Sequence, residues 1–184
     1  MRVISGMRRG KKLAAPAGTE TRPTLDRVKQ IMFDTIQFEI EGKTVLDLFC
    51  GSGQLGVEAL SRGAAVCYFN DSSAQALNVA KRNISDCGFE KNARVSCNLY
   101  TQCVTMLQRN SERPDIVFLD PPYHRGLIDA ALQALIEGDC LAADAIVVCE
   151  HATDETVTVP ADFAVIKDKK CGEVTLTILR AKAL

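Results

Sequence analysis

The sequence predicts an α/β fold in which a mostly parallel, doubly wound sheet carries helices on both faces. Short apolar runs alternate with amphipathic helical segments along most of the chain. A glycine-rich segment follows the first run, and acidic residues stand at the ends of several runs. Because parallel sheets bind ligands at the carboxyl ends of their strands, these acids mark the edge where a site is expected.

A chain of 184 residues with 47% hydrophobic content is long enough for one domain with a sizeable core. The net charge is −1, but residues 1–30 carry +6 and the remainder carries −7. A basic arm on an acidic body is typical of a protein that contacts a polyanion, and a solvated tail is the alternative. We therefore expect a basic N-terminal hairpin extension over 1–24 and a main domain over 25–184.

Within the arm, residues 2–5 and 11–14 are expected to pair as a small β-hairpin. Thr24 offers an N-cap for a helix whose inward face would hold Val28, Ile31, Met32, Ile36 and Ile40. Phosphate contacts from such an arm would position a substrate rather than specify it. The candidate contact residues are Arg2, Arg8, Arg9, Lys11, Lys12 and Arg22.

Strand patterns in the main domain lie at 45–49, 66–70, 93–97, 115–119 and 145–150. A closing hairpin is expected from 163–167 and 174–180, joined around 169–172. A helix is expected after the glycine segment, and a second over 77–87, with Gly88 as its stop. A short helix is expected around 104–107, and the clearest amphipathic helix lies at 127–136.

The eight cysteines form no C-x-x-C pair, and most lie in apolar runs, where a free thiol packs as a small hydrophobe. We therefore expect no metal site and a reducing, cytoplasmic compartment. No stretch approaches the ~18 to 20 apolar residues that a membrane span requires, so no membrane contact is expected.

The segment 47–56 contains G-x-G-x-x-G, and Asp71 lies twenty residues beyond Gly51. This pattern fits dinucleotide and S-adenosylmethionine sites equally, because both need backbone close to the ligand and an acid for the ribose. Asp47, just ahead of the glycines, favours S-adenosylmethionine, since a carboxylate suits a cationic amino group and repels a pyrophosphate. A buried acid that binds loop N–H groups is the alternative for Asp47.

The turn Asp120-Pro121-Pro122-Tyr123 follows the apolar run 116–119. The prolines stiffen the turn and supply no N–H groups. The Asp120 carboxylate and the Pro121 carbonyl can accept both N–H bonds of a nucleobase amine, which favours its reactive form, and Tyr123 can stack on the base. The turn therefore predicts methyl transfer to an exocyclic amine without a metal.

Residues 2–6, 22–24, 47–53, 59–64 and 120–123 together resemble the RsmD family of 16S ribosomal RNA guanine-N2 methyltransferases. The resemblance implies a Rossmann-like class I methyltransferase fold, S-adenosylmethionine as cofactor, and a guanine of the small ribosomal subunit, or of its assembly intermediate, as substrate. The turn 120–123 would hold the amine, and the basic residues of the arm would bind RNA. The implied cofactor-binding residues are Asp47, Phe49, Gly51, Gly53, Asp71, Ser72, Gln102 and Cys103.

One departure concerns adenine, because Gln102-Cys103 stands where many class I enzymes carry an acid. A side-chain amide or the Cys103 backbone would then contact the base. Three alternatives stay open: a DNA adenine or cytosine amino-group methyltransferase, a non-catalytic ribosome-assembly factor, and an NAD-dependent dehydrogenase. The first usually brings a larger target-recognition segment, and the last rests on the glycine pattern alone.

Overall fold

The computed structural model of the chain describes residues 1–15 and 23–182. The strands are β1 (Thr44–Asp47), β2 (Val66–Asp71), β3 (Ala93–Cys97), β4 (Ile116–Leu119), β5 (Ile146–Ala152), β6 (Phe163–Cys171) and β7 (Val174–Ala181). The helical elements are the 3₁₀ turn η1 (Gly6–Arg8), α1 (Pro23–Thr35), α2 (Gln54–Ser61), α3 (Ala74–Asp86), α4 (Tyr100–Arg109) and α5 (Leu127–Glu137).

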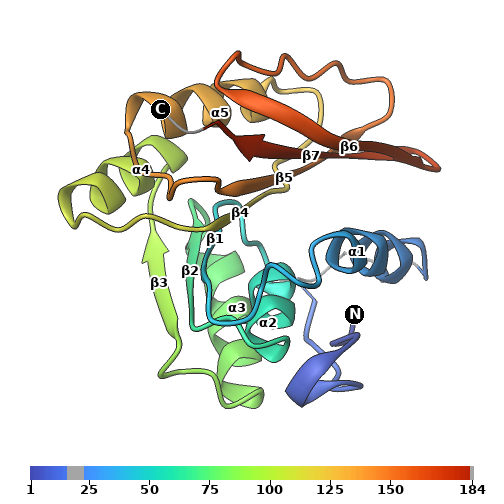
Figure 1. Ribbon diagram of the computed structural model, residues 1–184. Helices are drawn as coiled ribbons and strands as arrows, with labels where there is room; N and C mark the ends of the chain where they lie inside the picture. The colour runs from blue at the N-terminus through green and yellow to red at the C-terminus, as the bar shows by residue number, and fades with distance from the viewer. Residues whose placement is uncertain (16–22, 183–184) are drawn as a thin grey trace.

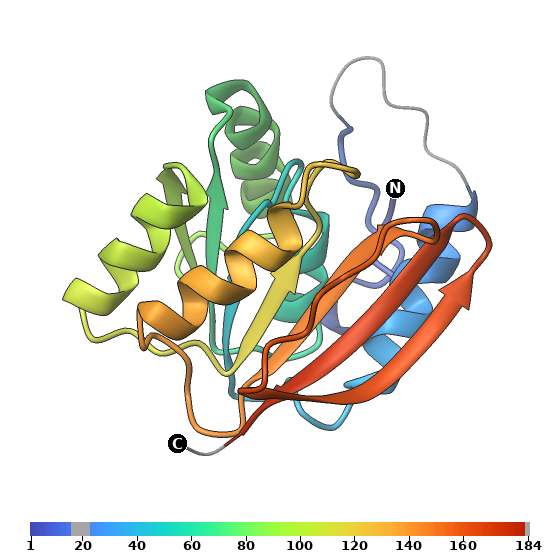
Figure 2. The same ribbon diagram turned by 90° about the horizontal axis from the view of Figure 1, so that it is seen from above.

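The strands form one sheet in the order β3-β2-β1-β4-β5-β7-β6, seen in Figure 1. The pairs from β3 to β5 are parallel, whereas β7 pairs antiparallel with both β5 and β6. The predicted doubly wound sheet with a closing hairpin is confirmed. The view from above shows α4 and α5 on one face of the sheet and α2 and α1 on the other (Figure 2).

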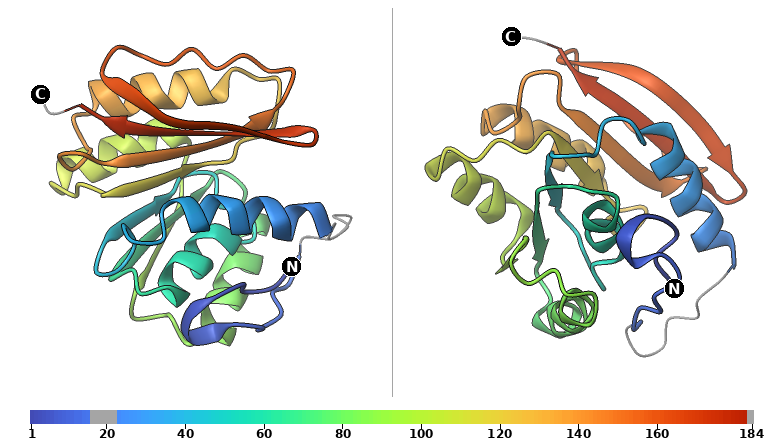
Figure 3. Two further views of the ribbon diagram at one scale, coloured as in Figure 1. Left: turned by 45° about the vertical axis from the view of Figure 1, so that its right-hand side comes forward. Right: turned by 60° about the horizontal axis from the view of Figure 1, so that its bottom comes forward.

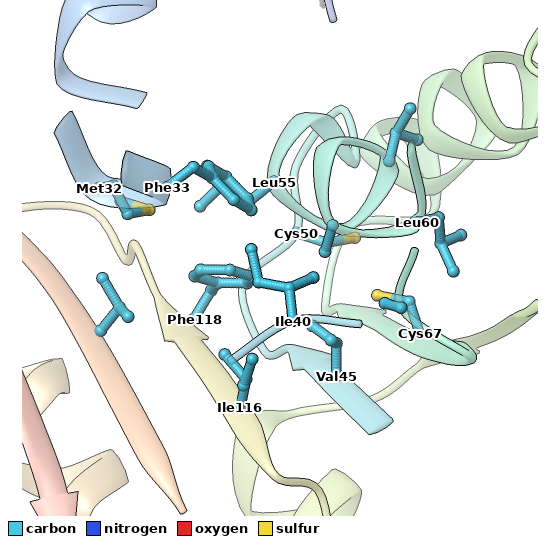
Figure 4. Packing of buried hydrophobic residues seen from close by; sticks show 14 of the residues in the cluster. Met32, Phe33, Ile40, Val45, Cys50, Leu55, Leu60, Cys67, Ile116 and Phe118 are labelled. Atoms are coloured by element: carbon cyan, nitrogen blue, oxygen red, sulfur yellow. The ribbon is translucent and has the colours of Figure 1, made fainter. Parts of the chain in front are cut away.

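Both faces of the sheet are buried, which explains the continuous apolar runs of the central strands. All four residues of β4 are buried, and alternate side chains point to opposite faces. Phe118 packs on Phe33 of α1 at 5.3 Å between ring centroids, in the core beneath α1, α2 and α3 (Figure 4). Val117 and Leu119 belong to the second core, beneath α4 and α5.

The first helix differs from its prediction at both ends. It begins at Pro23, so Thr24 lies in its first turn and is not the N-cap. Proline is favoured at the first helical position, where its missing N–H costs nothing. The helix ends at Thr35, and the predicted inward residues Ile36 and Ile40 are buried from the connection that follows.

The two hairpins also differ from expectation in detail. In the arm, the only ladder bridge outside the named strands joins Arg2 to Lys12 among the described residues, and η1 forms the turn. At the carboxyl end, β6 continues to Cys171, so the turn is shorter than predicted. Gly172, with φ of +73°, adopts the left-handed backbone that this tight turn requires.

The arm is fixed to α2 by the fully buried carboxylate of Glu58. This side chain accepts the backbone N–H groups of Ile4 at 2.8 Å and Ser5 at 3.0 Å. It also accepts from Arg62 Nε at 2.8 Å, and Lys29 Nζ lies 3.3 Å away. A buried charge is stable only when it is paired and hydrogen-bonded, so the arm and the acid depend on each other.

Helix α2 lies directly against β2 because Gly56 has no side chain. A Cβ at this position would stand 2.2 Å from a ring carbon of Phe69 and 2.7 Å from Cys67 Sγ. Both neighbours are fully buried and have no room to withdraw. The close approach places the glycine loop that precedes α2 over the end of β1.

We expect Gly56→Ala to lower the free energy of unfolding by about 2 kcal/mol, because overpacking costs roughly 1–3 kcal/mol or more and outweighs the gain in helix propensity of about 1 kcal/mol. Urea unfolding measures the change. Gln108→Ala, at an exposed position of α4, is the control and should change stability by less than about 0.5 kcal/mol. A more stable Gly56→Ala protein would contradict the packing argument.

Candidate active site

A cavity of about 610 Å³ opens at the carboxyl ends of the central strands. Residues from four segments line it: 48–51 after β1, 70–72 at the end of β2, 98–100 after β3, and 120–127 after β4. These segments meet beside β1, where the strand order reverses and open α/β sheets bind their ligands. The cavity is therefore the candidate active site.

The structure brings eight of the twelve predicted catalytic and cofactor-binding residues to this wall and leaves four away from it. The predicted residues on the wall are Phe49, Gly51, Asp71, Ser72, Asp120, Pro121, Pro122 and Tyr123. The predicted residues that do not line it are Asp47, Gly53, Gln102 and Cys103. The glycine loop and the Asp-Pro-Pro-Tyr turn thus face one common space.

Asp71 is held in a fixed orientation at the end of β2. Its Oδ2 accepts the N–H of Gly51 at 2.9 Å, and its Oδ1 accepts the N–H of Ser73 at 2.8 Å. A carboxylate offers about four lone-pair sites, so each oxygen can still accept a ligand hydroxyl. Gly51 has a φ of +53°, and a Cβ there would meet no protein atom within 4 Å. Backbone and ligand can therefore come close at this point.

Asp47 lies beneath the glycine loop and is only 1% exposed. Its Oδ2 accepts the N–H of Gly56, in the first turn of α2, at 3.0 Å, so a backbone N–H of the helix and not of the loop is its partner. Burial raises the pKa of Asp47 to about 7, against the opposing effect of that hydrogen bond. A direct contact between Asp47 and the cofactor stays a prediction.

The remaining predicted residues off the wall have local structural contacts. Gly53 precedes α2 with φ of +75°, and a Cβ there would stand 3.2 Å from the Ala80 Cβ. Gln102 accepts the N–H of Leu99 at 3.1 Å at the start of α4. Cys103 is fully buried in the core under α4 and α5. The role of Gly53 in cofactor binding and the roles of Gln102 and Cys103 toward adenine also stay predictions.

Apolar and aromatic side chains that the sequence analysis missed line the cavity after β3. Leu99 is 57% exposed, and the ring of Tyr100 lies 5.9 Å from that of Phe49. Such surfaces suit a flat, weakly polar base. The available signal was their position, because Leu99 and Tyr100 follow a strand whose end faces the site.

The Asp-Pro-Pro-Tyr turn is tied to β5 through a buried acid that the sequence analysis also missed. Tyr123 donates its hydroxyl hydrogen to Glu150 Oε1 at 3.1 Å. Burial, followed by the charge of Glu150 and then of Asp47, raises the pKa of Asp120. Burial likewise raises the pKa of Glu150, which is 6% exposed. The sequence could have indicated Glu150 as a site residue, because this acid ends an apolar run in the same way as Asp47.

The glycine-loop thiol of Cys50 is buried, and burial strongly raises its pKa. A thiol is a useful nucleophile only as the thiolate, so Cys50 is a packing residue. Within 1–15 and 23–182, no three His, Cys, Asp or Glu side chains are grouped to hold a metal ion. The helices of the same residues include none long and apolar enough to cross a membrane.

The basic turn of the arm points away from the cavity. Arg8 does not line the cavity. Its backbone N–H donates to Ser61 Oγ at 2.9 Å, and its Nε donates to the Cys87 carbonyl at 2.6 Å. Ser61 and Cys87 are at the far ends of α2 and α3 from the glycine loop. Arg2 lies 3.4 Å from Asp26. The side chains of Arg9, Lys11 and Lys12 are exposed, and Arg22 lies outside the described residues.

Comparison with known proteins identifies the family. A family model described as Conserved hypothetical protein 95 matches residues 1–180. The chain belongs to this family. It is the RsmD family that the sequence analysis expected, and its fold is that of class I S-adenosylmethionine-dependent methyltransferases. S-adenosylmethionine is the cofactor of enzymes with this fold.

Two curated relatives of this RsmD-family protein are named as rRNA methyltransferases. The small-subunit methyltransferase D of Haemophilus influenzae is 33% identical, over 95% of this chain and 91% of the relative. YlbH of Bacillus subtilis, provisionally named an rRNA methyltransferase, is 40% identical over 87% of this chain and 86% of the relative. The solved structure of a provisionally named methyltransferase, yhhF of Escherichia coli, matches with a TM-score of 0.87, 29% identity and coverage of 100% and 99%.

Stability should depend on pH through Asp47. In the folded protein this acid keeps its proton up to about pH 7, whereas an unfolded Asp loses it near about pH 4. The folded state binds more protons between these values, so the contribution of Asp47 to stability is fully present below about pH 4 and is lost as the pH rises to about 7.

We expect the unfolding free energy of the wild type, minus that of Asp47→Asn, to decrease from pH 4 to pH 7 and then to level off. Urea unfolding at stepped pH measures the difference. Glu173→Gln, which neutralises an exposed acid, serves as the control. A difference for Asp47→Asn that does not vary with pH would show that the acid is ionised in the fold.

Proposed function

We propose that this protein transfers a methyl group from S-adenosylmethionine to the exocyclic N2 amine of a guanine in 16S ribosomal RNA. The single observation that supports methyl transfer to an amine most directly is that the glycine loop and the Asp-Pro-Pro-Tyr turn line the same cavity. The rRNA methyltransferase names of the relatives support the substrate class. The choice of N2 of guanine rests on the family resemblance and on the chemistry of the turn.

The wall after β1, β2 and β3 fits the cofactor. The backbone at Gly51 allows close approach, and Asp71 has acceptor sites for the ribose hydroxyls. Leu99 and the Phe49–Tyr100 pair provide apolar surface for adenine. S-adenosylmethionine, when bound, supplies an electrophilic methyl group. Acids that ionise reluctantly are suited to this cationic ligand, because its charge favours their carboxylate forms.

The turn after β4 prepares the amine. Asp120 and the Pro121 carbonyl accept its two N–H bonds, which returns the lone pair from the ring to nitrogen. Once the nitrogen has accepted the methyl group that the bound donor would supply, it would have to lose one proton. Asp120 is the acid on the turn that can take this proton, and burial beside Glu150 raises its affinity for it.

Tyr123 is placed to support the base. Its hydroxyl is held by Glu150, while the residue as a whole is 36% exposed at the cavity. An anchored ring loses little conformational freedom when a base stacks on it, so the ordering cost of binding is small.

The substrate context is part of the proposal. We propose that the RNA is presented in the small ribosomal subunit or in its assembly intermediate, in the cytoplasm. A DNA amino-group methyltransferase would use the same turn, and an assembly factor would use the same cofactor fold without turnover. The experiments below separate these outcomes.

Asp120→Ala should lower kcat by about 10²-fold or more while leaving cofactor affinity within a few-fold, since an interaction with the reacting group is lost. Transfer of labelled methyl groups to small subunits that lack the modification measures turnover, and mass spectrometry identifies the base. Glu137→Ala, at an exposed position at the end of α5, is the control. If the wild type labelled duplex DNA and not the small subunits, the rRNA proposal would be wrong. Full turnover by Asp120→Ala would contradict the proposed role of the turn.

The ring and the hydroxyl of Tyr123 should have separable effects. Tyr123→Ala should raise KM for the RNA substrate by about 10-fold or more, because a stacking contact is worth roughly 1–3 kcal/mol. Tyr123→Phe keeps the ring and should raise KM by only about 2- to 4-fold, because only the bond to Glu150 is lost. Equal effects of the two variants on KM would show that the base does not stack on this ring.

A further inference from the structure

A series of hollows leads away from the active-site cavity across one side of the molecule. The first, which we call the mouth hollow, lies between Tyr123-His124, residues 152–154 and the β6–β7 turn. The second, the helix cleft, lies between α1 at Arg27, Val28 and Ile31 and the turn at 169–172. The third, the arm cleft, has a volume of about 610 Å³ and lies between α1 and the arm at 2–5 and 9–10.

Shared wall residues join these hollows into one path. Tyr123 lines both the active-site cavity and the mouth hollow. Lys170 and Gly172 line both the mouth hollow and the helix cleft. Arg27 lines both the helix cleft and the arm cleft. Figure 3 shows the corresponding arrangement, with α1 between the β6–β7 hairpin and the N-terminal arm.

Basic side chains outnumber acidic ones on the path beyond the mouth hollow. At the mouth hollow, Lys170 faces the acids Asp154 and Glu173. The charged residues of the helix cleft are all basic: Arg27, Lys169 and Lys170. All three residues are exposed. The body of the protein carries a net negative charge, so this stretch of positive charge contrasts with its surroundings.

The arm cleft is also basic, and some of its arginine side chains are already paired with acids. It is lined by Arg2, Arg9, Arg27 and Arg62 against Asp26 and Asp34. Arg2 lies against Asp26, and Arg62 is bound to the buried Glu58. Arg9 and Arg27 are exposed on its wall. Guanidinium groups at a polar cleft are suited to phosphate oxygens, which they can bind with two parallel hydrogen bonds.

We infer that this path, from Tyr123 past Lys170 and Arg27 to the arm cleft, binds the phosphate backbone of the RNA strand that continues from the target base. The inference rests on the proposed function and adds the route and side chains that hold the substrate. A base that enters the cavity must leave its stack, so its neighbouring phosphates must follow the protein surface. The path gives them basic side chains from three elements that are distant in the sequence.

The path also assigns different roles to the basic residues of the arm. Arg2 and Arg9 line it, whereas Arg8 is occupied by the Cys87 carbonyl at the end of α3. Lys169, Lys170 and Arg27 were not among the RNA-binding residues expected from the sequence, and the path adds them. Because backbone contacts to phosphate are independent of sequence, they position the strand and leave base choice to the cavity.

The test compares two triple variants that remove the same charge. The path variant is Arg27→Gln, Lys169→Gln and Lys170→Gln. The control variant is Lys81→Gln, Arg82→Gln and Lys91→Gln, at exposed positions on and beside α3. Urea unfolding checks that both are folded, and single Lys170→Gln provides a milder version. The probes are a 12-nucleotide oligouridylate for binding and small subunits lacking the modification for turnover.

We expect the path variant to bind oligouridylate about 10-fold or more weakly, and its slope of log affinity against log salt to be smaller by about 2, from roughly 0.7 per lost phosphate contact. KM for small subunits should rise by a similar factor, with kcat and cofactor affinity unchanged. The control should stay within about 2-fold in each measurement. Equal behaviour of the two triple variants would overturn the path.

The outcomes separate this inference from the proposed function. If the wild type methylates small subunits and the two variants have the same KM and salt slope, only the path fails. If the wild type leaves small subunits unmethylated, the proposed function fails, and oligouridylate binding still decides whether the path holds RNA.

Discussion

The adjacency of β1 and β4 is the constraint on which the candidate site depends. The two strands pair in parallel, with Asp47 opposite Phe118, and the helices that follow them cover opposite faces of the sheet. The chain must therefore separate at the carboxyl ends of these strands, and a crevice opens between the glycine loop and the Asp-Pro-Pro-Tyr turn. Neither segment would face the other if β1 and β4 were not neighbours.

The distribution of charge divides the protein into two regions. Asp47, Asp120 and Glu150 are gathered at the strand ends, where burial opposes their ionisation. Basic side chains gather at α1, the arm and the β6–β7 turn, where they line the helix cleft and the arm cleft. A cationic ligand and a polyanion therefore meet complementary surfaces of one small domain. This separation also limits the attraction between the acids of the site and the cations of the surface, because exposed charges are screened over about a Debye length.

Much of the fold was predictable because the central strands are buried on both faces and their apolar runs are unambiguous. Asp71 and the turn 120–123 were predictable for the same reason, since each follows such a run. The sequence could not show that Asp47 turns under its loop, because a shift of one residue reverses the direction of a strand side chain. Glu150 was missed because its contact with Tyr123 joins β5 to the turn after β4, which are distant in the sequence. The path past Arg27 and Lys170 depends on tertiary contacts that no local pattern records.

Gly56 explains why the glycine pattern did not distinguish a nicotinamide enzyme from a methyltransferase. Gly51 and Gly53 of the pattern lie in the loop, but Gly56 is required only because α2 packs closely against β2. Any α/β protein that brings these two elements into such contact will carry a glycine there, whatever molecule it binds. Sequence searches that weight all three glycines equally will group proteins by architecture. The acids that flank the motif, and the turn two strands away, are the better guides to chemistry.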